Sequence, residues 1–520
     1  MTTSFTRFAV IAVAAAGIFA AQGAAAGLLR TTNGLGSDWG NSLNWSGFNQ
    51  PDTQMEDADL RDSMTLTTNA SIGGIRSRFS SSLFIRNSSV LTLNGITPGG
   101  TTPFTSSVLE GRTFVRDNAF LINTGFSDLT ILDLVATGNG RVRNLAGAGG
   151  RMTLGNPFRR HRVEGNAQLE NTGILTIAAA AVDFSGTTNL VNEGTGILDQ
   201  GMGEILMYES AEALNRSQHL KTGGNLLILQ NAKYENRNIF TQSAGTTEIG
   251  RAGSGGLFNG GLFENNGSLT HDGGTTTIDV GGVLLNNSQI NQNDGAISVL
   301  SGGQLSNDNL IVINGGTVDV SAGGAINGIG IATQNGGTLR VNGEMIQTGF
   351  NGFVPNGLTI NGGTLEGTGA VRANVANIGG TVGPGNSPGT LTVDGNYAQG
   401  PGGTLAMEIA SLLAFDVLDI SGSATLDGIL DLTVGAGYAA SAMDGDTFTI
   451  VEWDSFSGAF ATVSGLNFAA DKFFTLDYTA TGLTLTVNAG QVAEVAEPGM
   501  IALFGLGVAG IGFMRRKRRG

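Results

Sequence analysis

Three histidines are the side chains best suited to acid–base or metal chemistry in this chain of 520 residues, which contains no cysteine. They are His161, His219 and His271, and none belongs to a catalytic or metal-binding motif. The lack of cysteine excludes disulfides, thiolate zinc sites and cysteine nucleophiles. The sequence therefore assigns no catalytic residue, no metal ligand and no cofactor, and it predicts a protein that is not an enzyme.

Charged side chains offer a second route to chemistry. Asp279 and Asp319 lie close to two repeats apart, so in a repeating structure they could lie on neighbouring faces. A polysaccharide-cleaving enzyme is the alternative to a non-enzymatic protein. Such an enzyme would need these carboxylates to cluster with arginines or with each other. We favour the interpretation that these two are solvated carboxylates on strands.

One basic run lies outside the C-terminal tail, and it consists of Arg159, Arg160, His161 and Arg162. We predict a solvated insertion loop at this run. Pairing with neighbouring carboxylates and contact with an anionic polymer are the alternatives.

Spacing argues against two kinds of bound ion. Calcium-binding rolls repeat every nine residues, whereas the repeat described below has 21, and no phosphate-binding GxxxxGK[ST] loop is present. Ice binding would need an unbroken rank of threonines. Thr275, Thr317 and Thr338 recur at suitable spacing, but Ala296 interrupts the rank, so ice binding is the weakest alternative.

The composition is rich in glycine and poor in charge. Glycine supplies 84 residues, charged residues are 13%, and the net charge is −15 at pH 7. Phosphate backbones need a basic face, so we expect no nucleic-acid partner. Few charges and many aliphatic residues also disfavour a disordered chain.

The middle of the chain has a regular internal repeat. Glycines recur at a step of 21, at Gly274, Gly295, Gly316 and Gly337. Asparagines show the same step in groups, at Asn123 and Asn144, Asn171 and Asn192, Asn215 and Asn236, and Asn265, Asn286 and Asn307. Between groups the step is 23 to 29, as expected if insertions bulge from a turn while the register resumes. Short runs between these residues alternate polar and apolar, which is typical of strands.

This pattern predicts an all-β protein, a right-handed parallel β-solenoid with about 21 residues per coil over residues 70–380. A β-propeller is the rival, but its blades need about 40 residues or more. We expect Asn171, Asn192, Asn215, Asn236, Asn265, Asn286 and Asn307 to share one turn position. Turns favour residues that tolerate a positive φ, and stacked amides can hydrogen-bond along the axis as a ladder.

The N-terminus has the layout of a secretory signal peptide, residues 1–26. Arg7 precedes an apolar run at 8–21, and Ala24 and Ala26 offer a small-residue cleavage site before Gly27. We expect an N-terminal helix here, with a membrane anchor as the alternative. Residues 27–69 form an entry segment.

The C-terminus, residues 490–520, has three features in a fixed order. Glu497 and Pro498 precede a predicted transmembrane helix at 499–514. The chain then ends in a basic cluster of Arg515, Arg516, Lys517, Arg518 and Arg519. This order resembles the PEP-CTERM sorting signal of Gram-negative secreted proteins, although Ala496 stands where that signal normally has its first proline. The resemblance implies an exosortase-type processing enzyme as a partner, acting while the helix holds the chain in the inner membrane.

Two further segments are similar to autotransporter passenger proteins. The stretch SDWGNSLNWSG, with Trp39 and Trp45, resembles their entry segment, where two tryptophans could cover the open end of the first coil. The run TVGPGNSPGTLTVDGNYAQGPGGTLAMEI resembles the autotransporter-associated β-helix repeat. Residues 381–489 are accordingly predicted to form a β-rich repeat and cap.

The sequence thus predicts an exported, non-enzymatic protein of the cell surface or extracellular matrix of a Gram-negative bacterium. We expect it to be anchored in the membrane during processing and then surface-bound or extracellular. Its rod would serve adhesion or contact with exopolysaccharide in a biofilm. The link to a matrix is implied by the family resemblance.

Overall fold

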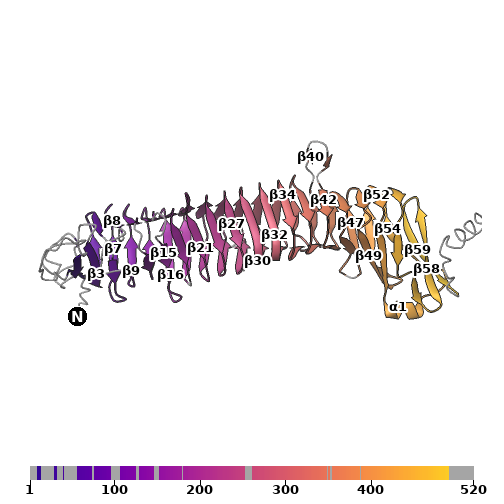
Figure 1. Cartoon of the computed structure of the whole chain (residues 1–520), viewed down its shortest axis with the longest axis horizontal. Helices are drawn as coiled ribbons and strands as arrows, with labels where there is room; N and C mark the ends of the chain where they lie inside the picture. The colour runs from indigo at the N-terminus through magenta and orange to yellow at the C-terminus, as the bar shows by residue number, and fades with distance from the viewer. Residues whose placement is uncertain are drawn as a thin grey trace, which may run out of the picture.

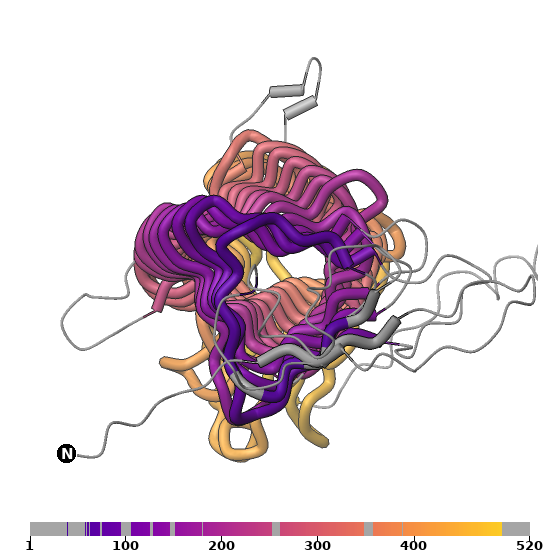
Figure 2. The backbone as a smooth tube through the Cα atoms, turned by 90° about the vertical axis from the view of Figure 1, so that its left-hand side faces the viewer, coloured from indigo at the N-terminus to yellow at the C-terminus, as the bar shows by residue number. Residues whose placement is uncertain are grey.

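The computed structural model describes residues 9–12, 28–31, 39 and 56–490, with gaps at 73–74, 95–105, 125–127, 146–150, 179, 252–259, 348–349, 352–353, 356 and 387. The chain forms a right-handed parallel β-solenoid of about 16 turns with about 21 residues per turn. Figure 1 shows a rod in which the chain advances from one end to the other. Seen along the axis, successive coils superpose around a common interior (Figure 2).

Each coil contributes three short strands, and each strand pairs in parallel with its counterparts one coil before and after. In one coil these strands are β20 (Asn189–Asn192), β21 (Ile197–Gln200) and β22 (Glu204–Met207). The next strand, β23 (Glu212–Asn215), returns to pair with β20. Stacking in this way gives each strand inside a stack a partner on both sides, which is why such short strands are stable together.

The strands form three stacks along the rod. Stack 1 contains β5 (Ala70–Ile72), β8 (Val90–Leu93), β11 (Phe120–Asn123), β14 (Arg141–Asn144), β17 (Gln168–Asn171), β20, β23, β26 (Lys233–Asn236), β29 (Gly261–Asn265), β31 (Gly282–Asn286), β33 (Gln304–Asn307), β36 (Ala325–Asn327), β39 (Glu344–Ile346), β44 (Ala370–Arg372), β47 (Thr390–Val393), β51 (Val417–Ile420) and β54 (Thr447–Glu452).

Stack 2 contains β3 (Glu56–Asp62), β6 (Ile75–Ser77), β9 (Ser106–Leu109), β12 (Asp128–Ile131), β15 (Arg151–Leu154), β18 (Ile174–Ile177), β21, β24 (Gln218–Lys221), β27 (Ile239–Gln242), β30 (Ser268–Ile278), β32 (Gln289–Val299), β34 (Leu310–Ile313), β37 (Ile331–Gln334), β42 (Gly357–Ile360), β45 (Asn374–Asn377), β48 (Tyr397–Gln399), β52 (Ser423–Leu426) and β55 (Ser455–Gly458).

Stack 3 contains β4 (Met64–Leu66), β7 (Leu83–Ile85), β10 (Thr113–Val115), β13 (Leu134–Ala136), β16 (Arg160–Gly165), β19 (Ala181–Gly186), β22, β25 (Asn225–Ile228), β28 (Thr246–Ile249), the C-terminal halves of β30 and β32, β35 (Thr317–Val320), β38 (Thr338–Val341), β43 (Thr364–Gly367), β46 (Thr381–Pro384), β49 (Thr404–Ser411), β53 (Ile429–Val434) and β56 (Thr462–Ser464).

The interior is filled by columns of apolar side chains that repeat at the same register position in every coil. One such column in stack 1 runs through Leu190, Ala213, Tyr234, Phe263, Leu284 and Leu305, all buried. Within it the rings of Tyr234 and Phe263 stack with centroids 4.8 Å apart. The alternation seen in the sequence therefore places one apolar face of each strand inside the rod.

Glycine is required where the corner between stacks 2 and 3 brings successive backbones together. Gly316 has a φ of +63°, and a Cβ at this position would lie 2.4 Å from the carbonyl oxygen of Gly295 in the preceding coil. Gly274, Gly295 and Gly337 share the positive φ. The regular glycine step thus reflects both a left-handed turn and a close approach between coils.

Insertions leave the register intact, as the sequence predicts. Asn236 and Asn265 are separated by a long step of 29 in the sequence, yet they pair directly as neighbours in stack 1. Asn265 and Asn286, at the regular step of 21, pair in the same way.

The coil stack does not end at residue 380. Stack 3 continues in parallel through β46, β49, β53 and β56. An antiparallel sheet of β54, β59 (Gly482–Ala489), β58 (Lys472–Thr479) and β57 (Asn467–Ala469) then closes the C-terminal end, beside the short helix α1 (Ala436–Ser441). Phe448 is fully buried between this sheet and the last coils. Two small antiparallel pairs, β40 (Phe350–Asn351) with β41 (Val354–Pro355) and β49 with β50 (Ala414–Phe415), branch from the coils.

The N-terminal segment differs from the predicted helix where it is described. Ala9–Ala12 forms strand β1, which pairs antiparallel with β2 (Leu28–Thr31) and β3. The end of a solenoid presents unpaired backbone groups, which a short extended segment can satisfy. Trp39 is buried in the core, and its amide donates to the carbonyl oxygen of Thr65 at 2.8 Å.

Several predicted features of the two ends fall outside the described residues. They are Trp45, the cleavage-site residues Ala24 and Ala26, and the tail at 491–520. Within the described ranges, no helix has the length and apolar character that a membrane crossing requires.

Candidate functional site

The asparagines of the repeat occupy one position, the last residue of the stack 1 strands. Each is buried, and each Nδ2 donates to the Oδ1 of the asparagine in the next coil at 2.7 to 2.8 Å from Asn144 to Asn307. The expected amide ladder is therefore present. The expected reason for its position is wrong, because none of these asparagines has a positive φ. They recur along the rod because their side chains hydrogen-bond to one another inside it.

A second buried polar column lies at the end of the stack 2 strands, and the sequence reasoning missed it. Its members are Gln200, Lys221, Gln242, His271, Gln292, Gln334, Asn377 and Gln399, with Ile313 and Ile360 between some of them. Most of these side chains donate to carbonyl oxygens of the glycine-rich corner. Gln242 Nε2, for example, lies 3.0 Å from the carbonyl oxygen of Thr275. Gln200, Lys221 and Gln242 follow one another at the regular repeat step, and this signal could have revealed the column.

All three histidines are buried inside the rod. His219 lies between the Tyr234 hydroxyl at 2.6 Å and Gln200 Oε1 at 3.2 Å, and burial lowers its pKa to about 3. Burial also lowers the pKa values of His161 and His271 below their usual range. The histidines are therefore neutral parts of the interior, and none lies on the outer surface.

The basic run does not form the predicted insertion loop. Residues 160–165 are strand β16, because this stretch continues stack 3 in register with β19. Arg159 pairs with Asp133 at 2.8 Å, and Arg160 pairs with Asp183 at 2.6 Å and with Glu204 at 2.7 Å. Arg162 points outward from β16. Pairing with neighbouring carboxylates, one of the alternatives, is what the structure contains.

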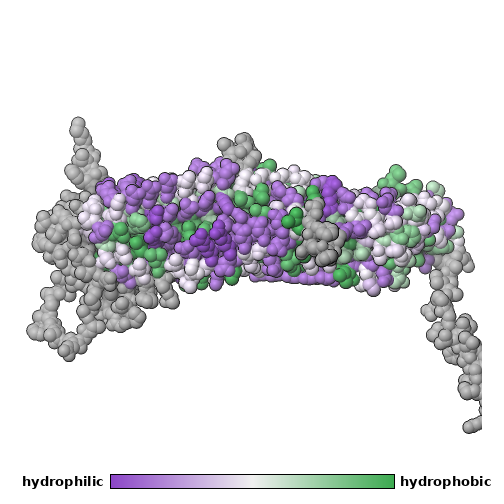
Figure 3. Space-filling view, turned by 90° about the horizontal axis from the view of Figure 1, so that it is seen from above, coloured by the Kyte–Doolittle hydropathy of each residue, from purple (hydrophilic) through white to green (hydrophobic). Residues whose placement is uncertain are grey.

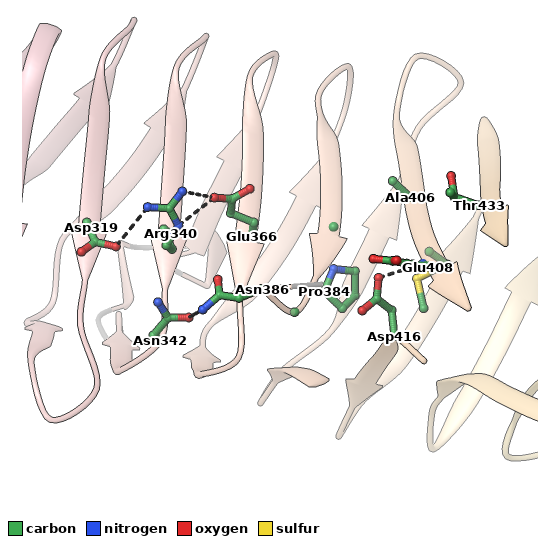
Figure 4. Close-up of a pocket in the computed structure, with 13 residues that line it drawn as sticks. Asp319, Arg340, Asn342, Glu366, Pro384, Asn386, Ala406, Glu408, Asp416 and Thr433 are labelled. Atoms are coloured by element: carbon green, nitrogen blue, oxygen red, sulfur yellow. Dashed lines mark hydrogen bonds and ion pairs between the residues drawn. The ribbon is translucent and has the colours of Figure 1, made fainter. Parts of the chain in front are cut away.

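A groove lies on the outside of stack 3, with a volume of about 790 Å³ (Figure 4). It crosses β35, β38, β43, β46, β49 and β53, which are six successive strands, so it runs parallel to the rod axis for about 24 Å at the usual strand spacing. Its charged lining residues are Asp319, Arg340, Glu366, Glu408 and Asp416.

One end of the groove is an ion-pair ladder. Arg340 Nη2 lies 2.6 Å from Glu366 Oε1, and Arg340 Nη1 lies 3.7 Å from Asp319 Oδ1. The three side chains stand on adjacent strands and remain partly accessible. Asp319 Oδ1 is buried and accepts no hydrogen bond. This end thus presents partly accessible charges of both signs to a ligand.

The other end presents a carboxylate without a protein partner. The side chain of Glu408 forms no hydrogen bond or ion pair with any described residue, whereas its backbone amide donates to Asp416 Oδ2 at 2.8 Å. Asp416 Oδ1 accepts from the amide of Gly389 at 2.8 Å, so Asp416 fastens the turn that follows β46 to β49. Burial raises the pKa of Asp416, although its two backbone hydrogen bonds act in the opposite direction. Asp416 is a structural brace, and Glu408 is the free carboxylate.

Small residues create the hollow between the two ends. Gly383 and Ala406 occupy the outward position that Arg340 and Glu366 hold in preceding coils. A Cβ built on Gly383 would meet no atom within 4 Å. The groove is therefore open because its floor lacks side chains.

The two aspartates singled out from the sequence are not brought together. Asp319 lines the groove, whereas Asp279 follows β30, where its Oδ1 accepts from the amide of Val280 at 2.7 Å. Among the described residues, no group of three histidine, aspartate or glutamate side chains is placed to hold a metal ion.

The threonine rank is longer than the sequence predicts. Thr246, Thr275, Thr317, Thr338, Thr364, Thr381 and Thr404 share one outward column, with Ala296 as the exception. The adjacent outward column carries Glu248, Asp319, Arg340 and Glu366. Charged side chains beside the rank hydrate this face, which does not favour an ice-binding surface.

The fold and these columns define a parallel β-solenoid protein. No protein-family model matches the sequence, and no curated protein matches it.

Proposed function

We propose that this chain is an exported, non-enzymatic β-solenoid of the cell surface or extracellular matrix that binds an extended polysaccharide along its groove. The observation that carries the proposal is the direction of the groove, which follows the rod axis across six strands. A polymer can lie along such a groove and meet similar backbone geometry at each coil. Figure 3 shows polar side chains over much of one long face of the rod, as suits contact with a hydrated polymer.

The lining chemistry supports a hydroxyl-rich ligand. Asp319 and Glu408 can accept hydrogen bonds from hydroxyl groups, and Arg340 can donate to ring or hydroxyl oxygens. Asn342 lies at the edge, where its Oδ1 accepts from Asn386 Nδ2 at 3.1 Å. Adhesion and contact with biofilm exopolysaccharide are the roles that such binding would serve.

Delivery to the surface is the second part of the proposal. Its support is the sequence order of Glu497-Pro498, an apolar segment at 499–514 and the basic cluster at 515–519. An exosortase-type enzyme would act on this tail while the segment holds the chain in the inner membrane, before release to the surface or medium.

A glycan array and a polysaccharide-depletion assay on the full-length protein test the binding proposal. Gly383→Trp should fill the groove without a backbone clash and weaken binding by about tenfold or more. Gly437→Trp is the matched control, since Gly437 lies on α1 and its Cβ position is also open. Equal binding by both variants would refute the groove as the site.

A polysaccharide-cleaving enzyme is the second candidate, and the free Glu408 carboxylate in the same groove as Arg340 favours it. The same assay separates the two functions, because cleavage products would appear with an enzyme and not with a binding protein. If products form, Glu408→Gln should abolish them, because glycoside cleavage needs an ionisable carboxyl group. The amide oxygen of glutamine can still accept a hydrogen bond from the ligand, so binding should be retained.

A further inference from the structure

The charge of the rod changes sign along its length. Residues 63–166 contain 11 arginines and 5 aspartates or glutamates, a net charge of +6. Residues 167–490 contain 8 lysines or arginines and 29 aspartates or glutamates, a net charge of −21. The N-terminal part of the solenoid is therefore a basic segment in an acidic protein.

A hollow of about 410 Å³ lies on the outside of stack 3 in this basic segment. Its lining includes Phe79, Phe84, Phe114, Arg112, Arg159 and Glu110. The rings of Phe84 and Phe114 come from β7 and β10, which are adjacent in the stack. These rings are parallel, with centroids 4.6 Å apart, and both are partly exposed. They form an aromatic platform on the outer surface of the rod.

A buried carboxylate fixes two arginines at the edge of this platform. Asp133 Oδ2 accepts from Arg112 Nε at 3.0 Å and from Arg159 Nη1 at 2.8 Å. The Asp133 side chain is 5% exposed, whereas those of Arg112 and Arg159 are 47% and 49% exposed. One negative charge therefore holds two positive charges in place, and the remaining N–H groups of both guanidinium groups are available to a ligand.

A third arginine strengthens the positive charge of the platform. The Arg116 guanidinium lies 4.5 Å from the centre of the Phe114 ring. It forms no ion pair with any described residue, so its charge is not neutralised by a neighbouring carboxylate. On the adjacent face, Arg141 and Arg143 lie 5.6 and 5.1 Å from the Phe120 ring in the same manner.

We propose that this hollow binds a carboxylate-bearing sugar of an acidic polysaccharide. Arg112 and Arg159, which line the hollow, would bind the sugar carboxylate, because guanidinium groups match carboxylates in geometry and charge. Arg116, which lies over the Phe114 ring, would add positive charge beside them. The apolar side of the sugar ring would lie against the exposed edges of the stacked Phe84 and Phe114 rings, which supply the apolar part of a site that is otherwise polar. This inference rests on the proposed function and names the class of polysaccharide and the place where it is recognised.

The lining favours a sugar over a nucleic acid. Phosphate backbones are bound by faces with many unpaired basic groups. Here Glu110 and Asp133 line the same hollow. Glu110 can accept a hydrogen bond from a sugar hydroxyl, a group that the backbone of a DNA duplex lacks.

The test measures binding of the full-length protein to a polyuronate, to neutral dextran and to a short DNA duplex at several salt concentrations. Arg159→Gln leaves Arg112 to pair with the buried Asp133, so the variant should fold. Arg116→Gln removes a charge that has no ion-pair partner among the described residues. Each variant should lower polyuronate affinity by about tenfold, since Arg159→Gln removes a charge-assisted hydrogen bond and Arg116→Gln removes a positive charge beside the hollow. Arg216→Gln is the control, because Arg216 is equally exposed, at 47%, and ion-paired to Glu193.

Affinity for the polyuronate that falls with salt and with Arg159→Gln and Arg116→Gln, but not with Arg216→Gln, would support the proposal. Equal losses in all three variants, or tighter binding of the DNA duplex than of the polyuronate, would overturn it. Polyuronate binding could also be insensitive to Arg159→Gln and Arg116→Gln but lost in Gly383→Trp. This result would overturn the assignment of the hollow and would still support the proposed function of the groove. No binding of any polysaccharide would overturn both.

Discussion

Asn286 Nδ2 lies 2.8 Å from Asn307 Oδ1 in the next coil, and neither side chain is accessible to solvent. The same Nδ2 also lies 3.0 Å from the carbonyl oxygen of Leu310. Each rung of the ladder thus joins a side chain to the next side chain and to the backbone of the next coil. Buried amides are stable only when they are hydrogen-bonded, so the ladder fixes the register between coils as well as adding stability.

Asn286→Val should destabilise the solenoid by about 2–4 kcal/mol, because Asn307 Oδ1 then lacks its donor inside the rod. The midpoint of urea unfolding measures this. Asn287→Val is the control, since Asn287 is exposed and only its surface hydrogen bonds are lost. Equal shifts in the two variants would contradict a role for the buried ladder.

Lys221→Gln should stabilise the protein at pH 7 by up to about 3 kcal/mol. Lys221 Nζ donates to the carbonyl oxygens of Gly223, Gly224 and Ala244, and burial lowers its pKa to about 8. The unfolded chain, with a lysine pKa near 10.5, binds more protons between pH 8 and 10.5, so wild-type stability rises with pH across this window. Glutamine, which fits the same column at Gln242, should remove that rise.

Unfolding at pH 7, 8, 9 and 10 measures the effect. Lys233→Gln is the control, because Lys233 is ion-paired at the surface with Glu264. A Lys221→Gln variant that keeps the wild-type pH dependence would refute the interpretation.

The solenoid should lose stability as pH falls below about 6.5. Burial lowers the pKa values of His161, His219 and His271, so the unfolded chain binds more protons in this range and is favoured by acid. His271→Gln should make the decline shallower, since glutamine occupies the neighbouring positions of the column. The slope of unfolding free energy against pH measures this, with the exposed Asn293→Gln as control. A steeper decline in His271→Gln would be the opposite of what burial requires.

The tail carries a prediction that depends on the sequence alone. If Glu497-Pro498 marks a processed sorting signal, the intact mass of protein recovered from the cell surface or medium should lack residues 499–520. Deletion of residues 515–520 should reduce retention in the membrane and mis-sort the protein, because the basic cluster resists translocation. A recovered mass that still includes 499–520 would indicate a permanent anchor.

The period of the solenoid could be predicted because its glycines and asparagines have single physical causes. Gly316 has a positive φ and lies against Gly295, and Asn286 pairs with Asn307, so the same residue types recur from coil to coil in the middle of the rod. The buried column at Gln200, Lys221 and Gln242 was missed because several side chains can donate to the same carbonyl oxygens. Its residue types vary although its position does not.

The surface sites could not be predicted from the sequence, because insertions between coils change the spacing of the residues that form them. Phe84 and Phe114 stack directly although their spacing in the sequence is longer than the repeat period, which conceals their relationship. The groove depends on Gly383 and Ala406, which are small residues that carry no chemical signal in the sequence. Arg159 and Asp133 meet across coils of unequal length, so their pairing required the register to be known.

The nearest-neighbour construction of the asparagine ladder has a mechanical consequence. Each coil is bonded mainly to the coil before it and the coil after it, with few longer links such as the ion pair of Arg160 with Glu204, so tension between the two ends is borne by the interfaces in series. The rod should yield one coil at a time, and each coil of about 21 residues would release about 70 Å of extended chain. A protein built in this way can lengthen stepwise under shear while the coils that have not opened keep their surface sites in place.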